Sequence, residues 1–253
     1  MKRFFQKKSA RKEEPSEHEI NAKRLETLLS YSIGIMDSDR AYHKTDIFSL
    51  IKLLTENMTL NSVMDLLTTD KNPKYPYISH FFIHLNPEAD EKHKLSSCLL
   101  PHYYKDEYSF EDQIHLATDP VLTFPWVHGR LVDLITSIGS PDEPWEEDRE
   151  NHRVALILPV GVSFFYNGLH SSFAGMLKRE GAIKFSKDCY HQILDISPLF
   201  ELLRFDGTTY IIKETGEIAG KAMSFEFGCI FEIGRLLNER GICFHNLNNK
   251  KDS

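Results

Sequence analysis

The stretch from Val154 to Ser186 constrains the fold more than any other part of this 253-residue chain. Two apolar runs, Val154 to Pro159 and Val162 to Tyr166, are long enough for buried strands, and the Asn-Gly pair that follows them marks a turn. The residues from Phe173 to Leu177 then have helical spacing, and a second strand follows this helix. The order strand, tight turn, helix and strand predicts an α/β unit built around a sheet.

The turn Asn167-Gly168-Leu169-His170-Ser171-Ser172 is the strongest candidate for a binding site. A helix that begins directly after a strand leaves several backbone N–H groups without intrahelical partners, and these groups and the helix dipole favour an anion such as phosphate. Gly168 allows close approach of the backbone, Ser171 and Ser172 add hydroxyl donors, and His170 adds a donor whose charge depends on pH. The alternative is structural, with Asn-Gly making a turn and Ser171 capping the helix.

Several other polar residues are candidates for the same site. Arg130, one turn into a predicted helix, is a candidate cation because a guanidinium group matches phosphate geometry. If Mg²⁺ takes part, Asp148 or Asp188 is the expected ligand, because hard cations prefer carboxylates. His152 and His191 are candidates for acid–base chemistry or metal binding. The alternative for these charged segments is an exposed turn with solvated side chains.

The order of the elements also resembles a known superfamily. Strand, Asn-Gly-Leu-His-Ser-Ser, small-residue helix and strand are similar to the nucleotide-contacting motif of the ParB/sulfiredoxin superfamily, in which a Gly-x-His-Arg-type turn opens a helix and holds phosphates. Val121 to Ile138 resembles the segment upstream of that turn, so the resemblance covers residues 119–190. Gly168 and His170 fall on the motif, whereas Ser171 stands where the superfamily usually has arginine. The whole chain is also similar to a bacterial family of unknown function, which implies no activity.

Composition narrows the class of protein. Hydrophobic residues make up 41% and charged residues 26% of the chain, as in ordinary globular proteins. No apolar run approaches the length of a membrane span, and no secretory signal or paired-cysteine motif occurs, so a cytoplasmic location is expected. The net charge of -7 disfavours a broad nucleic-acid-binding face, so the basic arm before Glu13 is the one candidate for contact with nucleic acid, and the alternative for it is a solvated arm.

The chain is expected to have an α+β (mixed α/β) fold, with an N-terminal helical part packed on a small C-terminal mixed sheet. Four parts are predicted: a disordered basic arm at 1–16, a mainly helical region at 17–118, a ParB/sulfiredoxin-like α/β domain at 119–245, and a polar tail at 246–253.

Periodicity predicts the individual elements. Helices are expected at 17–37, 45–57, 61–68, 109–119, 126–138, 197–203 and 222–240, the last ended by Gly241. Strands are expected at 121–124 and 242–244, together with a hairpin that joins 208–212 to the residues after 218. The polar segment 87–94 is expected to be a loop or exposed turn.

Together these patterns predict a cytosolic bacterial protein that binds a phosphate-bearing ligand, foremost a nucleotide, at Asn167–Ser172. One alternative is a non-catalytic module that uses its amphipathic N-terminal helices for homo-oligomerisation or for binding a partner. A second alternative is a Mg²⁺-dependent nuclease or phosphotransferase in which His170 acts as the catalytic residue with a carboxylate. The sequence has no Walker loop and no nucleophile elbow, so it leaves open whether there is any turnover.

Overall fold

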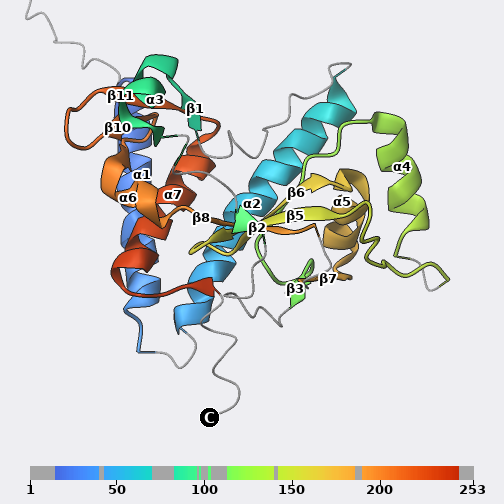
Figure 1. The fold of residues 1–253 in the computed structure, drawn as a ribbon. Helices are drawn as coiled ribbons and strands as arrows, with labels where there is room; N and C mark the ends of the chain where they lie inside the picture. The colour runs from blue at the N-terminus through green and yellow to red at the C-terminus, as the bar shows by residue number, and fades with distance from the viewer. Residues whose placement is uncertain are drawn as a thin grey trace, which may run out of the picture.

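The computed structural model describes residues 15–39, 43–69, 83–95, 97, 102–103, 113–139, 142–185 and 190–244. These residues form helices and several sheets, so the predicted mixed α+β class is confirmed. The long helix α2 (His43–Thr68) runs through the middle of the molecule (Figure 1). On one side of it lie α1 (Glu17–Met36), α7 (Phe225–Glu239) and a four-stranded sheet, and on the other lie a five-stranded sheet, α4 (His128–Ser137) and α5 (Leu169–Lys178).

The five-stranded sheet has the order β2-β8-β5-β6-β4. Its strands are β2 (His102–Tyr103), β8 (Gln192–Asp195), β5 (Arg153–Leu158), β6 (Val162–Asn167) and β4 (Val121–Leu122). β5 and β6 form an antiparallel pair, whereas β4 runs parallel to β6 and β8 parallel to β5. The two apolar runs of the sequence are therefore confirmed as strands, and nearly all of their residues are buried, as expected for strands covered on both faces.

The four-stranded sheet has the order β1-β11-β10-β9. Its strands are β1 (Ile83–Leu85), β11 (Ile218–Ala222), β10 (Thr209–Ile212) and β9 (Leu203–Phe205), and the short helix α6 (Ser197–Leu202) leads into β9. The pairing of β10 with β11 confirms the predicted hairpin. A separate pair joins β3 (Gln113–His115) to β7 (Ala182–Lys184). Strands from both sides of residue 118 thus pair with each other, while the division into domains there stays a prediction.

The N-terminal helices form for reasons that the sequence shows only in part. Ser16 and Glu19 make a reciprocal capping box at the start of α1, and the predicted helix at 17–37 is confirmed. Two helices were predicted within 45–68, but α2 is continuous, so this prediction was wrong. Met58 and Thr59 are buried at the predicted break, and Thr59 Oγ1 accepts a hydrogen bond from Thr123 N at 3.4 Å. Packing against the sheet therefore carries the helix through Thr59, a residue of modest helix propensity.

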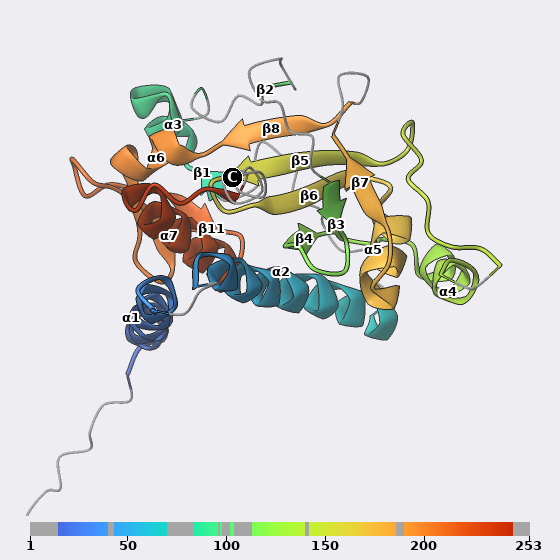
Figure 2. The same ribbon diagram turned by 90° about the horizontal axis from the view of Figure 1, so that it is seen from below.

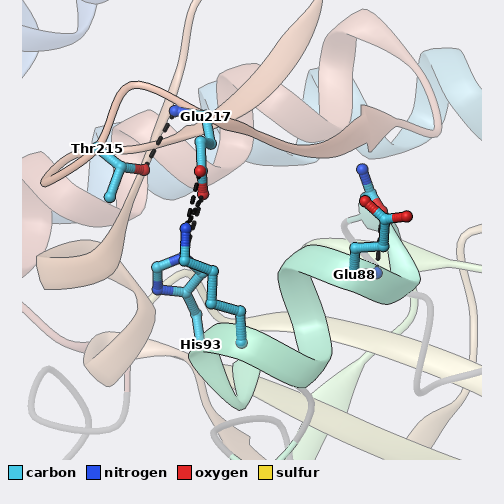
Figure 3. Close-up of polar contacts among 6 residues, drawn as sticks. Glu88, His93, Thr215 and Glu217 are labelled. Carbon is cyan, nitrogen blue, oxygen red and sulfur yellow. Dashed lines mark hydrogen bonds and ion pairs between the residues drawn. The ribbon is translucent and has the colours of Figure 1, made fainter.

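Residues 87–94 are not a loop as predicted, because Pro87–His93 form the helix α3. Asn86 caps it by accepting a hydrogen bond from Glu88 N at 3.0 Å, and Pro87 occupies the first turn. Lys92 and His93 at its other end contact the carboxylate of Glu217 beside β11 (Figure 3). The helix buries little besides Ala89. The sequence therefore has no apolar stripe here, and without one it shows no helical periodicity.

Several other elements differ from the predictions in their type or in the residues where they begin and end. Residues 113–115, placed in a helix by the sequence, form β3 with an alternating burial pattern, and residues 109–112 lie outside the described part. The helix predicted at 126–138 is the shorter α4, and α7 begins at Phe225, where Ser224 caps it. Gly241 has φ 61° just after α7, whereas residues 242–243 form no strand. The basic arm through residue 14 and the tail from residue 245 lie outside the described residues.

Within these described ranges, no helix is both long and apolar enough to cross a membrane.

Candidate ligand-binding site

The predicted turn forms the junction between β6 and α5. Gly168 has left-handed backbone angles, φ 73° and ψ 28°, and no side chain caps the helix that begins after it. Among the described residues, no acceptor takes a hydrogen bond from the N–H groups of Leu169, His170 or Ser171. Because Asn167 is exposed and Gly168 and Leu169 are half-buried, this positive end of the helix dipole lies at the surface.

His170 links this helix start to a second one. Its Nε2 accepts hydrogen bonds from Trp126 N at 3.2 Å and Val127 N at 3.0 Å, directly before α4. A neutral ring with an accepting Nε2 carries its proton on Nδ1, and no described residue accepts a hydrogen bond from that atom. α4 and α5 lie beside each other in both views (Figures 1 and 2), so two helix starts meet at one histidine.

A cation and an exposed aromatic ring accompany His170. Burial lowers the pKa of His170, and the positive charge of Arg130 on the first turn of α4 lowers this pKa further. Arg130 is exposed and forms no ion pair with a described residue, and the exposed Trp126 ring lies 6.2 Å from the ring of His170. The structure therefore brings the α5 start and His170 near Arg130, which the sequence analysis proposed as a cation for the same site.

The two serines of the turn have different environments. Ser172 is fully buried, with its Oγ 2.8 Å from Thr123 Oγ1, and it donates to Leu169 O at 3.1 Å. It therefore faces the interior and cannot be the hydroxyl donor that the sequence suggested. Ser171 is half-buried and does not cap the helix, because it is the third helical residue and its Oγ donates to Gly168 O at 3.1 Å.

His152 contacts Ser171, a pair that the sequence did not suggest. The distance from His152 Nε2 to Ser171 Oγ is 2.6 Å, while His152 Nδ1 accepts a hydrogen bond from Asp148 N at 2.9 Å. Neutral His152 thus carries its proton on Nε2 and donates it to Ser171, so it cannot act as a general base for this hydroxyl. Trp145 stacks on His152 at 4.8 Å and donates from Nε1 to Ser171 O at 2.7 Å. The pairing of β5 with β6 sets Arg153 opposite Asn167, and this register brings His152 close to Ser171.

Ser171 also lines an acidic cavity of about 380 Å³. Its polar lining includes Asp142, Glu143 and Glu146, all exposed. Three carboxylates repel a phosphate group, so this cavity does not favour an anion.

The remaining predicted residues do not form a metal centre in the described part of the chain. Asp148 lies in an exposed turn, where its Oδ1 accepts hydrogen bonds from Glu150 N at 3.0 Å and Asn151 N at 3.1 Å. His191 is buried and contacts Glu147 Oε1 at 3.1 Å, and Asp188 lies outside the described residues. No group of three or more histidine, cysteine or acidic side chains is arranged to hold a metal ion among the residues that the structure describes.

The fold and the site together define a mixed α+β protein in which the buried His170 connects the starts of α4 and α5. A model of a family of unknown function (DUF6710) matches residues 2–244, so the chain belongs to this family. No curated protein and no solved structure matches the chain.

The two buried histidines predict a stability that depends on pH. Burial lowers the pKa of His152 and of His170 below the ordinary value of 6.5. The folded protein holds both rings neutral, whereas the unfolded chain binds protons as the pH falls below about 6.5, so acid favours unfolding. We expect the free energy of unfolding in urea to decrease from about pH 7.5 to pH 5.5, and to decrease less in His170→Gln. An equal decrease in both proteins would contradict the contribution of His170.

Proposed function

We propose that the protein binds a phosphate-bearing ligand, foremost a nucleotide, at the start of α5. The observation that carries this proposal is the meeting of two helix starts at His170, with Arg130 beside them. Backbone N–H groups at a helix start bind phosphate oxygens well, and a guanidinium group adds a charged fork. His170 adds a neutral Nδ1–H donor, because its Nε2 is used to hold the loop before α4.

The exposed indole of Trp126 favours a nucleotide over inorganic phosphate. Its side chain is 42% exposed and lies within 6.2 Å of the His170 ring, measured between centroids. A base stacked on an aromatic ring of this kind contributes about 1–3 kcal/mol to binding. The resemblance of residues 119–190 to the ParB/sulfiredoxin superfamily supports the same ligand class through Gly168 and His170. In this proposal Arg130 supplies the positive charge that the superfamily has from an arginine at the position of Ser171.

Thermal unfolding in the presence of nucleotides, with and without Mg²⁺, tests the proposal. A ligand at a hundredfold excess over its Kd stabilises the fold by about 2.7 kcal/mol. We expect Asn167→Asp to abolish this stabilisation, because a carboxylate at the helix start repels phosphate although it favours the helix. Arg130→Gln is expected to weaken it.

Asn167→Ala is the matched control. The side-chain Nδ2 of Asn167 donates to Asn151 O at 2.6 Å, and both variants lose this hydrogen bond, but only the aspartate adds charge. The alanine variant should therefore keep the ligand-induced stabilisation. If neither nucleotides nor phosphate stabilise the wild type, or if both variants lose the effect equally, the proposal is wrong.

A further inference from the structure

The outer face of α2 carries an exposed apolar stripe. Leu53, Leu60, Met64 and Leu67 are 61%, 45%, 56% and 41% exposed, whereas the opposite face of the helix is buried. Together with the exposed Asn57, these residues follow one another in steps of four and three. This is the a/d spacing of a heptad seam, with a single polar residue inside it.

A groove lies beside the first half of this stripe. It measures about 950 Å³, runs between α1 and α2, and includes Leu28, Tyr31, Leu53 and Asn57 in its lining. Figure 2 shows that the second half of α2 extends past α1 beneath the five-stranded sheet. The helix therefore offers two surfaces: a groove along its first half and a projecting apolar ridge along its second half.

We propose that the groove of each chain receives the ridge of a second copy, with the two α2 helices antiparallel across a two-fold axis near Leu60. In such an isologous pair the same patch serves both partners, and Leu53 meets Leu67 of the second copy. This inference does not depend on the proposed ligand.

Charge favours this occupant and this orientation. The stripe from Leu53 to Leu67 has no charged residue at its seam positions, so pairing two copies brings no like charges together in the seam. Lys23 lines the groove on α1, and Asp65 lies on the exposed surface of the ridge, so the antiparallel pair sets Lys23 against Asp65 of the second copy. Neither side chain has an ion-pair partner among the described residues of its own chain.

Asn57 agrees with the antiparallel pair as well. Its Nδ2 donates to Glu226 Oε1 at 3.0 Å within the same chain. A parallel seam would place Asn57 against Asn57 of the second copy, where the two amides bond to each other. With a two-fold axis near Leu60, the antiparallel seam places Asn57 near Met64 of the second copy, so the amide keeps its hydrogen bond to Glu226.

Sedimentation equilibrium of the full chain tests the pairing. We expect a dimer, and we expect Leu60→Glu and Met64→Glu to weaken it at least about tenfold, because each variant puts a charge into the seam. Both residues are exposed in the single chain, so the circular dichroism spectrum of each variant should match that of the wild type. Ile218→Glu, at a residue that is 55% exposed on β11 away from the seam, is the control and should remain dimeric. A monomeric wild type, or dimers unaffected by both seam variants, would overturn the proposal.

Charge exchange and cross-linking test the orientation. Lys23→Glu and Asp65→Lys should each weaken the dimer, and the double variant should restore it. A mixture of Leu53→Cys and Leu67→Cys chains should form a disulfide-linked dimer on oxidation, above the background of the wild-type cysteines. Cross-linking of Leu67→Cys chains to each other, without the mixed species that joins Leu53→Cys to Leu67→Cys, would show a parallel pair and overturn the antiparallel arrangement.

Discussion

Replacing Arg235 by methionine is expected to lower the free energy of unfolding by ~3–5 kcal/mol, because it leaves a carboxylate buried without its cation. Arg235 Nε lies 2.8 Å from Glu232 Oε2 on the inner face of α7, and the two side chains are 14% and 10% exposed. Glu232 Oε1 also accepts a hydrogen bond from Phe205 N at 2.6 Å, and Arg235 donates to the carbonyl oxygens of Phe200 and Leu203. This network joins α7 to α6 and β9. Urea denaturation of the variant and the wild type measures the loss.

Two further variants separate burial from charge. Removing both partners in Glu232→Leu/Arg235→Met should cost less than removing Arg235 alone, because no uncompensated charge then remains in the interior. Arg240 also contacts a carboxylate, Asp37 Oδ1 at 3.4 Å, but these side chains are 29% and 58% exposed. Arg240→Met should therefore cost less than about 1 kcal/mol. Equal losses for Arg235→Met and Arg240→Met would show that burial of the first pair does not matter.

Local signals in the sequence were sufficient for much of the fold. The apolar runs gave β5 and β6, and the hairpin of β10 and β11 was evident from its turn, because these elements depend on neighbours close in the chain. Elements that depend on distant partners were missed. β3 exists because it pairs with β7, and α2 passes through its predicted break because the sheet covers Met58 and Thr59.

In the candidate site too, features that depend on residues close in the chain were predictable, and contacts between distant residues were not. The turn and the left-handed Gly168 follow from the Asn-Gly pair, and a role for Arg130 was proposed from the chemistry of its side chain alone. The contacts of Ser172 with Thr123, and of Ser171 with His152, arise only when the sheet is assembled. Hydroxyl groups that look available in the sequence are therefore used inside the protein. The exposed stripe of α2 could not be predicted either, because apolar residues at heptad spacing do not show which face of the helix the core covers.

Replacing Gly168 by alanine is expected to lower the free energy of unfolding by about 2–4 kcal/mol, from two causes that add. A left-handed conformation with φ 73° costs an alanine about 1–2 kcal/mol. A Cβ atom at this position would also lie 2.4 Å from His152 Cδ2, so the ring that holds Ser171 would have to move. Thermal and urea unfolding of the variant measure the sum of the two effects.

Gly216 provides the matched control for the backbone effect. Its φ is 74°, and a Cβ atom there would meet nothing within 4 Å, so Gly216→Ala carries only the conformational cost. The excess cost of Gly168→Ala over Gly216→Ala should disappear when His152 is also replaced by alanine, because the crowded ring is then absent. If the two glycine variants cost the same, contact with His152 does not restrict this position. If the excess is found, the glycine that the sequence assigned to close approach of a ligand is required by close approach of the protein's own histidine, and the ligand must be held by the N–H groups that follow it.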